Sequence, residues 1–324
     1  MKFAIFWGCK IPYYVEHYAT STRAVLEKLS VQIEEIEFNC CGYPTRNLHF
    51  ESFILSAARN LALAEREGLD ILTPCKCCFG SFKHAQHALN ENRELLRDAN
   101  KVLKEEGLRL NSGVEVKHLL TVLAEDVGLD SIKENVQQPF ENLKLAAHYG
   151  CHALRPAKIT GFDDPYAPTI FENLIKAIGG ESVEWSRRLE CCGNPVWGKN
   201  KELSLDLLKK KCADAKKAGA DFLCTACTYC QIQFDTVQSE ALADNESSDG
   251  LPAILYPQLL GLSLGLSSDA LGIDKNNLDI SRVESFLARP EPPEEEEEPS
   301  PEEEEDETET KTKDKPSEVE KTDE

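Results

Sequence analysis

Cysteine dominates the reactive side chains of this chain, which contains 13 cysteines among 324 residues. Ten of them follow one pattern that occurs twice: a single cysteine after glycine, a Cys-Cys-Gly-x-Pro doublet and a C-x-x-C pair. The first set is Cys9, Cys40, Cys41, Cys75 and Cys78, and the second set is Cys151, Cys191, Cys192, Cys227 and Cys230. The step from doublet to pair is 34 positions in one set and 35 in the other. This internal repeat indicates that the same ligand chemistry is used twice.

Thiolates are ligands for zinc and for iron–sulfur clusters. Four of them satisfy either a zinc ion or an ordinary iron–sulfur cube, so five in each set is a surplus. Adjacent cysteines chelate a single metal poorly but can bind two neighbouring irons. The surplus therefore suggests an unusual cluster, or a cluster together with a working thiol.

The three cysteines outside this pattern, Cys77, Cys212 and Cys224, are interpreted as buried structural residues. Cys224 also offers a competing C-x-x-C frame that ends at Cys227, although the frame that ends at Cys230 matches the first set better. His84 and His87 lie three residues apart in an expected helix and are interpreted as surface or core histidines.

Expected strands and helices alternate along the chain and would position these thiols. We expect strands at residues 3–7, 31–38, 70–73, 145–149, 182–185 and 221–224, a strand running into a helix at 114–120, and helices at 17–29, 53–64, 82–103, 170–178 and 203–218. This alternation predicts an α/β fold with a parallel sheet in each half. Loops at the carboxyl ends of parallel strands converge at one edge, so five thiols could meet at the rim of each half.

The chain is predicted to contain a first domain at residues 1–140, a second domain at 141–289 and an acidic tail at 290–324. Residues from about 250 to 288 are interpreted as a closing helical segment. The tail carries 18 acidic and 4 basic residues and one aliphatic residue, Val319. It is predicted to be disordered, because it has too little apolar surface to offset chain entropy.

Charge and composition exclude several classes of function. The net charge of −21 and the lack of a basic face argue against nucleic-acid binding. The apolar stretch before Cys9 is too short for a signal peptide, and no apolar run approaches the ~18 residues of a membrane span. We therefore expect a cytoplasmic protein, whose cysteines are ligands or redox thiols rather than disulfides. The chain has no G-x-G-x-x-G motif after a strand, no P-loop and no ferredoxin run, so electrons would have to come from a partner.

Longer strings around the cysteines carry a family resemblance. They are Phe-Trp-Gly-Cys at 6–9, Thr-Pro-Cys at 73–75 with Phe-Gly-Ser at 79–81, His-Tyr-Gly-Cys-His-Ala-Leu-Arg-Pro at 148–156 and Cys-Thr-Tyr-Cys-Gln-Ile-Gln-Phe-Asp at 227–235. Over about residues 1–270 the chain resembles the tandem cysteine-rich CCG domain family, and most closely the B-subunit family of CoB–CoM heterodisulfide reductase. The acidic tail is not part of the family pattern.

The resemblance implies two pseudo-repeated CCG domains, each a small, mostly parallel sheet with flanking helices. It also implies two noncubane [4Fe-4S] clusters, one held by the first set of five cysteines and one by the second, with zinc in one half as an alternative. The family's reaction is the two-electron reduction of a small-molecule disulfide that lies between the clusters. The implied partners are the ferredoxin-like iron–sulfur subunit, together with the flavin subunit, of heterodisulfide reductase.

Two further residues are candidates for catalysis. His152 follows Cys151, and we hypothesise that it donates protons to the leaving thiolates; the alternative is a histidine satisfied by the backbone. Arg155 could hold an anionic group of the substrate through bidentate pairing.

Three functions compete at this point. The first is the catalytic disulfide-reductase subunit of a complex. The second is an electron-transfer or anchor subunit of a succinate-, lactate- or glycolate-type dehydrogenase, and the third is a zinc-stabilised structural module. Two complete sets of five cysteines favour the first, because a relay protein could manage with fewer.

Overall fold

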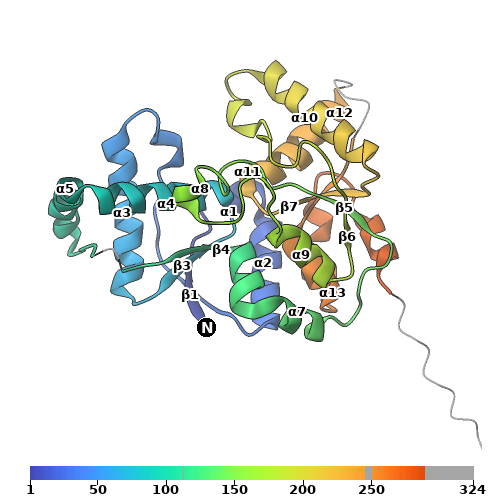
Figure 1. Ribbon diagram of the computed structural model, residues 1–324, viewed down its shortest axis with the longest axis horizontal. Coiled ribbons are helices and arrows are strands. Elements are labelled where there is room, and N and C mark those ends of the chain that lie inside the picture. Colours follow the sequence, from blue (N-terminus) through green and yellow to red (C-terminus); the bar gives the residue numbers. More distant parts are fainter. Residues whose placement is uncertain (112, 245–249, 289–324) are drawn as a thin grey trace, which may run out of the picture. The chain divides into compact units, whose positions relative to one another are not determined.

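Two four-stranded sheets, each entirely parallel, form the framework (Figure 1). The computed structural model describes residues 1–111, 113–244 and 250–288. The first sheet has the order β2-β1-β3-β4 and consists of β1 (Lys2–Ile5), β2 (Gln32–Glu35), β3 (Asp70–Thr73) and β4 (Val116–His118). The second has the order β6-β5-β7-β8 and consists of β5 (Lys144–Ala147), β6 (Glu181–Ser182), β7 (Phe222–Thr225) and β8 (Ala253–Leu255). The prediction of an α/β fold with a parallel sheet in each half is confirmed.

The strand sequences match their places in the sheets. All four residues of β7 are buried, as expected of a central parallel strand covered on both faces. The edge strand β2 is polar, with the sequence Gln-Ile-Glu-Glu and no fully buried residue.

Helices connect successive strands. The helices of the first half are α1 (Ile11–Tyr14), α2 (Glu16–Lys28), α3 (Phe50–Arg66), α4 (Lys76–Glu91), α5 (Arg93–Leu103), α6 (Leu119–Thr121) and α7 (Leu129–Asn135). Those of the second half are α8 (Ala157–Thr160), α9 (Ile170–Ala177), α10 (Lys201–Lys217), α11 (Thr228–Gln231), α12 (Gln238–Ala243) and α13 (Tyr256–Ser263). Two π-helical segments, Val122–Gly128 and Ile232–Val237, continue α6 and α11. Helix α13 packs against α2, and α4 packs against α8, so the two halves share helix contacts.

Some boundaries differ from the prediction. The helix expected at 82–103 is two helices that meet at Asn92, and the first of them begins at Lys76, directly after Cys75. The Asn92 side chain accepts hydrogen bonds from the backbone N–H groups of Glu94 and Leu95, which starts a new helix there. The segment expected to be helical at 250–288 also contains the strand β8, which completes the second sheet.

Residues Met1–Arg289 form one compact unit. Each half defined from the sequence contains one sheet, and Phe140 pairs with Leu287 in an isolated antiparallel bridge. The division at residue 140 stays a prediction, and the predicted disorder of residues 290–324 falls outside the described residues. Among the helices of the described part of the chain, none combines the length and apolar character needed to cross a bilayer.

Candidate metal centre

The first set of cysteines gathers in one pocket at the carboxyl ends of β1, β2 and β3. The pocket has about 290 Å³ of empty space, and all five members of the set line it: Cys9, Cys40, Cys41, Cys75 and Cys78. We call it the first pocket. Its sulfurs come from the segments that follow three strands: Cys9 follows β1, the doublet follows β2, and Cys75 caps the helix α4, which follows β3 and carries Cys78. The Sγ atoms of Cys40 and Cys9 lie 4.0 Å apart.

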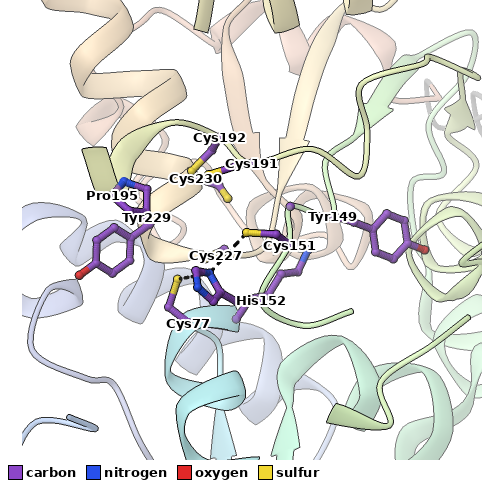
Figure 2. Close-up of a pocket in the computed structure, with 12 residues that line it drawn as sticks. Cys77, Tyr149, Cys151, His152, Cys191, Cys192, Pro195, Cys227, Tyr229 and Cys230 are labelled. Carbon is purple, nitrogen blue, oxygen red and sulfur yellow. Dashed lines mark hydrogen bonds between the residues drawn. The ribbon is translucent and has the colours of Figure 1, made fainter. Parts of the chain in front are cut away.

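The second set gathers in the same way at the ends of β5, β6 and β7 (Figure 2). This second pocket also has about 290 Å³ of empty space, and its lining includes Cys151, Cys191, Cys192, Cys227 and Cys230. The structure therefore brings together each of the two predicted groups of five thiols. Their role as ligands remains a proposal.

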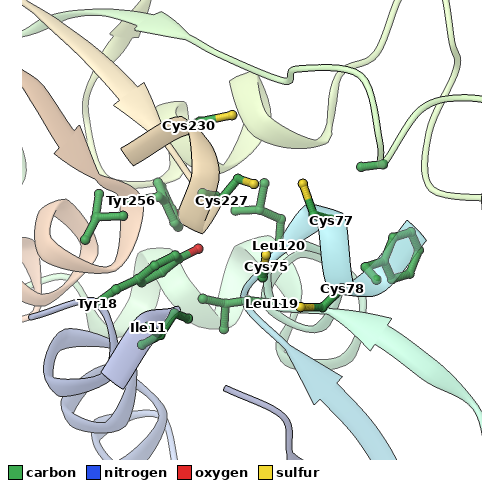
Figure 3. Packing of buried hydrophobic residues seen from close by; sticks show 14 of the residues in the cluster. Ile11, Tyr18, Cys75, Cys77, Cys78, Leu119, Leu120, Cys227, Cys230 and Tyr256 are labelled. Atoms are coloured by element: carbon green, nitrogen blue, oxygen red, sulfur yellow. The ribbon is translucent and has the colours of Figure 1, made fainter. Parts of the chain in front are cut away.

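Cys77 was missed as a candidate site residue. It is buried, as expected, but it lines both pockets. Its Sγ lies within 4.8 Å of the Sγ atoms of Cys75 and Cys227, so the two pockets adjoin at this thiol (Figure 3). The one sequence signal was the additional cysteine in Cys75-Lys-Cys-Cys78, since Tyr229 stands at the matching place in the second set.

The other two cysteines lie outside the two pockets. Cys224 is buried in the strand β7, and Cys212 donates a hydrogen bond from Sγ to Oε1 of Gln238 over 3.2 Å. Of the two possible C-x-x-C frames, the one from Cys227 to Cys230 places both sulfurs in the second pocket.

Crowding of the thiols shifts their acidity in the same way in both pockets. Hydrogen bonds with the thiols of Cys41 and Cys9 hold the pKa of Cys40 far below its ordinary value, and the same contacts raise the pKa of Cys41 and of Cys9. Cys191 repeats this relation with Cys151 and Cys192. Neighbouring thiols thus compete for charge, and a cation among them would favour several thiolates at once.

The surroundings of the sulfurs fit a thiolate-bound metal group. Gly8 and Gly150 both have a φ of 71°, and they bring the backbone directly against the sulfurs. A Cβ on Gly8 would lie 3.0 Å from Sγ of Cys78, and one on Gly150 would lie 3.5 Å from Sγ of Cys230. Thr228 lines the first pocket, and its hydroxyl has no hydrogen-bond partner among the described residues. All-sulfur ligand sets of this kind suit iron–sulfur clusters or zinc.

His152 lies where the two pockets meet. Its Nδ1 atom is 3.4 Å from Sγ of Cys77 and 3.6 Å from Sγ of Cys151 (Figure 2). The ring of Tyr43, from the first half, packs edge-on against the imidazole with a centroid distance of 4.9 Å. The imidazole therefore faces thiols from both halves.

Arg155 is not brought to either pocket. It is exposed, and its Nη1 atom donates to the carbonyl oxygen of Leu189 over 3.3 Å. Another arginine, Arg46, also lines neither pocket, but its charge acts on two residues that do: it lowers the pKa of Tyr43 against the raising effect of burial, and it adds to the lowering of the pKa of His152 by burial. Its Nη1 atom is buried and has no hydrogen-bond partner within the described residues. No motif in the sequence pointed to Arg46.

A close backbone contact positions His152 against α4, and it gives a first prediction. A Cβ on Gly80 would lie 2.6 Å from the carbonyl oxygen of His152, a separation that demands movement. We expect Gly80→Ala to lower the free energy of unfolding by about 1–3 kcal/mol, as overpacking does. Chemical denaturation of the anaerobically prepared protein measures this. Gly198→Ala is the control, because a Cβ on Gly198 meets no atom within 4 Å. Equal stability of the two variants would contradict the contact.

Comparisons with known proteins agree with this geometry. The family model described as "CCG: Cysteine-rich domain" matches residues 3–83 and 145–235. The B subunit of the ferredoxin/F(420)H(2)-dependent CoB-CoM heterodisulfide reductase from Methanosarcina acetivorans is 36% identical over 296 residues, which are 89% of this chain and 96% of that protein. The membrane anchor subunit of the 8-methylmenaquinol:fumarate reductase from Wolinella succinogenes is 32% identical over 87% of this chain and 99% of its own length.

A solved structure shows the same fold. The crystal structure of a hypothetical protein from Helicobacter pylori superposes with a TM-score of 0.69 at 18% identity, and the match covers 85% of this chain and 51% of that one. The family model spans both cysteine sets, and relatives above 30% identity match over most of their own length. The chain belongs to the CCG cysteine-rich domain family, as a member of the B-subunit family of heterodisulfide reductase.

Proposed function

We propose that this chain is the catalytic iron–sulfur subunit of a heterodisulfide reductase-like complex, which reduces a disulfide to two thiols. Each pocket would hold one noncubane [4Fe-4S] cluster, ligated by the five cysteines of its set. The observation that carries this proposal is that both pockets contain a complete set of five thiols.

Electron counting favours two adjoining centres. Reduction of an S–S bond consumes two electrons and two protons and yields two thiols. Iron–sulfur clusters bound in the two pockets would supply the electrons one at a time. Cys75 and Cys227, which belong to different sets, have their sulfurs within 4.8 Å of each other, so a small disulfide at the junction would be close to both sets.

The side chains at the junction have separate tasks. His152 would donate a proton to a departing thiolate, since its Nδ1 atom already faces the sulfurs of Cys77 and Cys151. Tyr43 and Tyr229 pack against each other with ring centroids 5.5 Å apart, and they would exclude water from the junction. Electrons would be delivered by a ferredoxin-like iron–sulfur subunit, together with a flavin subunit, of the same complex.

The guanidinium of Arg46 would bind an anionic group of the substrate, and this gives a second prediction. The charge of Arg46 acts on both His152 and Tyr43, and its buried Nη1 atom has no hydrogen-bond partner among the described residues. We expect Arg46→Met to raise KM about tenfold or more while kcat changes little, because a charge-assisted hydrogen bond would be lost. Steady-state kinetics with a disulfide substrate measures this. The exposed Arg155, for which the same role was predicted, provides the comparison through Arg155→Met; a larger KM effect at Arg155 would reverse the assignment.

Iron and acid-labile sulfide analysis of anaerobically purified protein tests the proposal. Two four-iron clusters give eight irons per chain, whereas four irons with one zinc would indicate that one half holds zinc. Zinc alone would leave a structural module and would overturn the proposal.

A second function is favoured by one specific comparison. The 32% identical relative from Wolinella succinogenes is named as an anchor subunit of a fumarate reductase, which corresponds to the electron-transfer alternative. Assays of the purified complex with an artificial low-potential electron donor separate the two functions. Reduction of a disulfide supports the first, and reduction of fumarate without reduction of a disulfide supports the second.

A further inference from the structure

Two buried lysines approach the second pocket. Lys76, in the first turn of α4, is 1% exposed and lines this pocket although it belongs to the first half of the chain. Lys211, on α10, is 0% exposed. Lysine is seldom buried to this degree without a compensating negative charge.

The contacts of both amino groups are those of ammonium ions. Nζ of Lys76 donates to the carbonyl oxygen of His148 over 3.2 Å and lies 4.9 Å from the ring centroid of Phe171. Nζ of Lys211 donates to the carbonyl oxygen of Arg187 over 2.5 Å and lies 5.4 Å from the ring centroid of Trp185. Carbonyl oxygens and aromatic faces both favour a cation.

Within the described residues, neither lysine forms an ion pair with a carboxylate. Lys76 lines the second pocket together with the five cysteines of the second set. Lys211 is tied to the same pocket through its bond to Arg187, because the carbonyl oxygen of the next residue, Arg188, accepts hydrogen bonds from the backbone N–H groups of Tyr149 and Gly150, which line the pocket. Thiolates of the second set would therefore supply the compensating charge.

His148 is a second indication that both lysines approach the same region of the structure. It is fully buried, its carbonyl oxygen accepts the hydrogen bond from Lys76, and its ring lies 6.0 Å from the ring of Trp185, over which the amino group of Lys211 lies. The two lysines therefore reach the same region from different helices.

The first pocket has neutral residues at the matching places. Thr228 follows Cys227 as Lys76 follows Cys75, and Thr228 lines the first pocket. Asn60 lies 20 positions after Cys40, as Lys211 lies 20 positions after Cys191. Asn60 is buried, and its amide donates to the carbonyl oxygen of Cys40 over 3.2 Å.

Lys10 is the one lysine that lines the first pocket in the described structure, and it differs from the two buried lysines. It is partly exposed, and its amino group lies over the rings of Tyr14 and Tyr229. Water and salt screen such a charge far more than they screen a buried one.

We propose that Lys76 and Lys211 raise the reduction potential of the metal centre in the second pocket above that of the centre in the first. This inference rests on the proposed function, because it requires a redox-active centre in each pocket. Reduction adds a negative charge, and a nearby buried cation stabilises that charge strongly at low dielectric. Of the two centres, the one in the second pocket is therefore the first to accept an electron.

Redox titration of the cluster-loaded protein, followed by electron paramagnetic resonance, tests this. Lys76→Met and Lys211→Met remove the charges and preserve most of the side-chain volume. We expect each variant to lower the one-electron reduction equilibrium constant of the same centre at least tenfold, which is about 59 mV. The other centre should stay within the error of the wild-type value. Cys151→Ser, at a proposed ligand of the second pocket, identifies the affected signal.

A matched variant serves as the control. Lys83→Met removes a lysine of α4 that lines neither pocket. It should leave the two potentials unchanged. If a lysine variant fails to retain iron, Thr228→Lys tests the same inference. This variant adds a charge to the first pocket and should raise the reduction potential of the centre there.

The outcomes separate this inference from the function on which it rests. Wild-type protein without two iron–sulfur centres would refute the proposed function itself. Two centres whose potentials stay unchanged in both lysine variants would overturn only the proposal that the lysines raise the potential of the second centre. The same holds if the two lysine variants shift the potentials of different centres.

Discussion

Replacing Cys192 by serine is expected to remove the metal of the second pocket and to leave that of the first. Cys192 is buried, lines the second pocket and belongs to the doublet that places adjacent thiols there. Serine keeps the size of the side chain but removes the sulfur that iron requires. We expect half of the iron and acid-labile sulfide per chain, and a fall in disulfide reduction of at least about a hundredfold. The magnitude follows because changes to residues that merely support ligands already cost about 10–100-fold.

Two further substitutions make this prediction specific. Cys41→Ser, at the matching position of the first pocket, should remove the other half of the iron. Cys212→Ser alters a cysteine that is equally buried in α10 but lies outside both pockets, and it should keep all of the iron. Full iron content in Cys192→Ser would show that the doublet does not bind metal in that pocket. Equal losses in all three variants would indicate general unfolding rather than loss of a ligand.

The gathering of five thiols in each half could be predicted from the sequence for a simple physical reason. The cysteines follow short strands, and parallel strands present their carboxyl ends at one edge of the sheet. It was therefore sufficient to recognise β1, β3, β5 and β7 and to count positions to the next cysteine. Errors of a few residues at the strand ends, as at β6, did not matter, because the segments that follow the strands, rather than the strands themselves, carry the sulfurs.

What joins the two halves could not be predicted in this way. Lys76 follows a ligand position of the first set yet lines the second pocket, and Cys77 lines both. Both placements depend on α4 beginning at Lys76 and on the close contact between Gly80 and the carbonyl group of His152. Such packing between distant segments leaves no periodic signal in the sequence. The sequence analysis predicted a helix that begins at Phe82. Lys76 and Cys77, which contact the second pocket, therefore fell in a predicted loop.

The same limit applies to charges. Arg46 and Lys211 are ordinary polar residues in their local sequence, and Lys211 stands in a run of three lysines. Only the fold shows that Lys211 is buried whereas its neighbour Lys210 is exposed and pairs with Asp206. Comparison of the two cysteine sets would have been the one route to Lys211 from sequence, because Asn60 occupies the matching position.

Replacing His152 by glutamine is expected to lower kcat for disulfide reduction by about 10²–10⁴-fold, the usual contribution of general acid catalysis. Each product thiolate takes up a proton to become a thiol, and His152 is the titratable nitrogen base within hydrogen-bond reach of the Cys77 and Cys151 sulfurs in the described structure. Glutamine approximates the length of the side chain and can donate a hydrogen bond, but it has no proton to transfer. Iron content and KM should therefore stay close to the wild-type values while kcat falls.

This split distinguishes proton transfer from support of the metal. A histidine that only supported Cys151 would, on replacement, cost iron in the second pocket, so the iron assay would change together with the rate. His84→Gln is the matched control. Burial lowers the pKa of His84 most, followed by the charges of Arg46 and His152, so His84 lies near His152. His84 nevertheless lines neither pocket. If His84→Gln lowers kcat as much as His152→Gln does, the proton donor has been misassigned. If neither variant changes kcat, the two protons reach the product thiols directly from water.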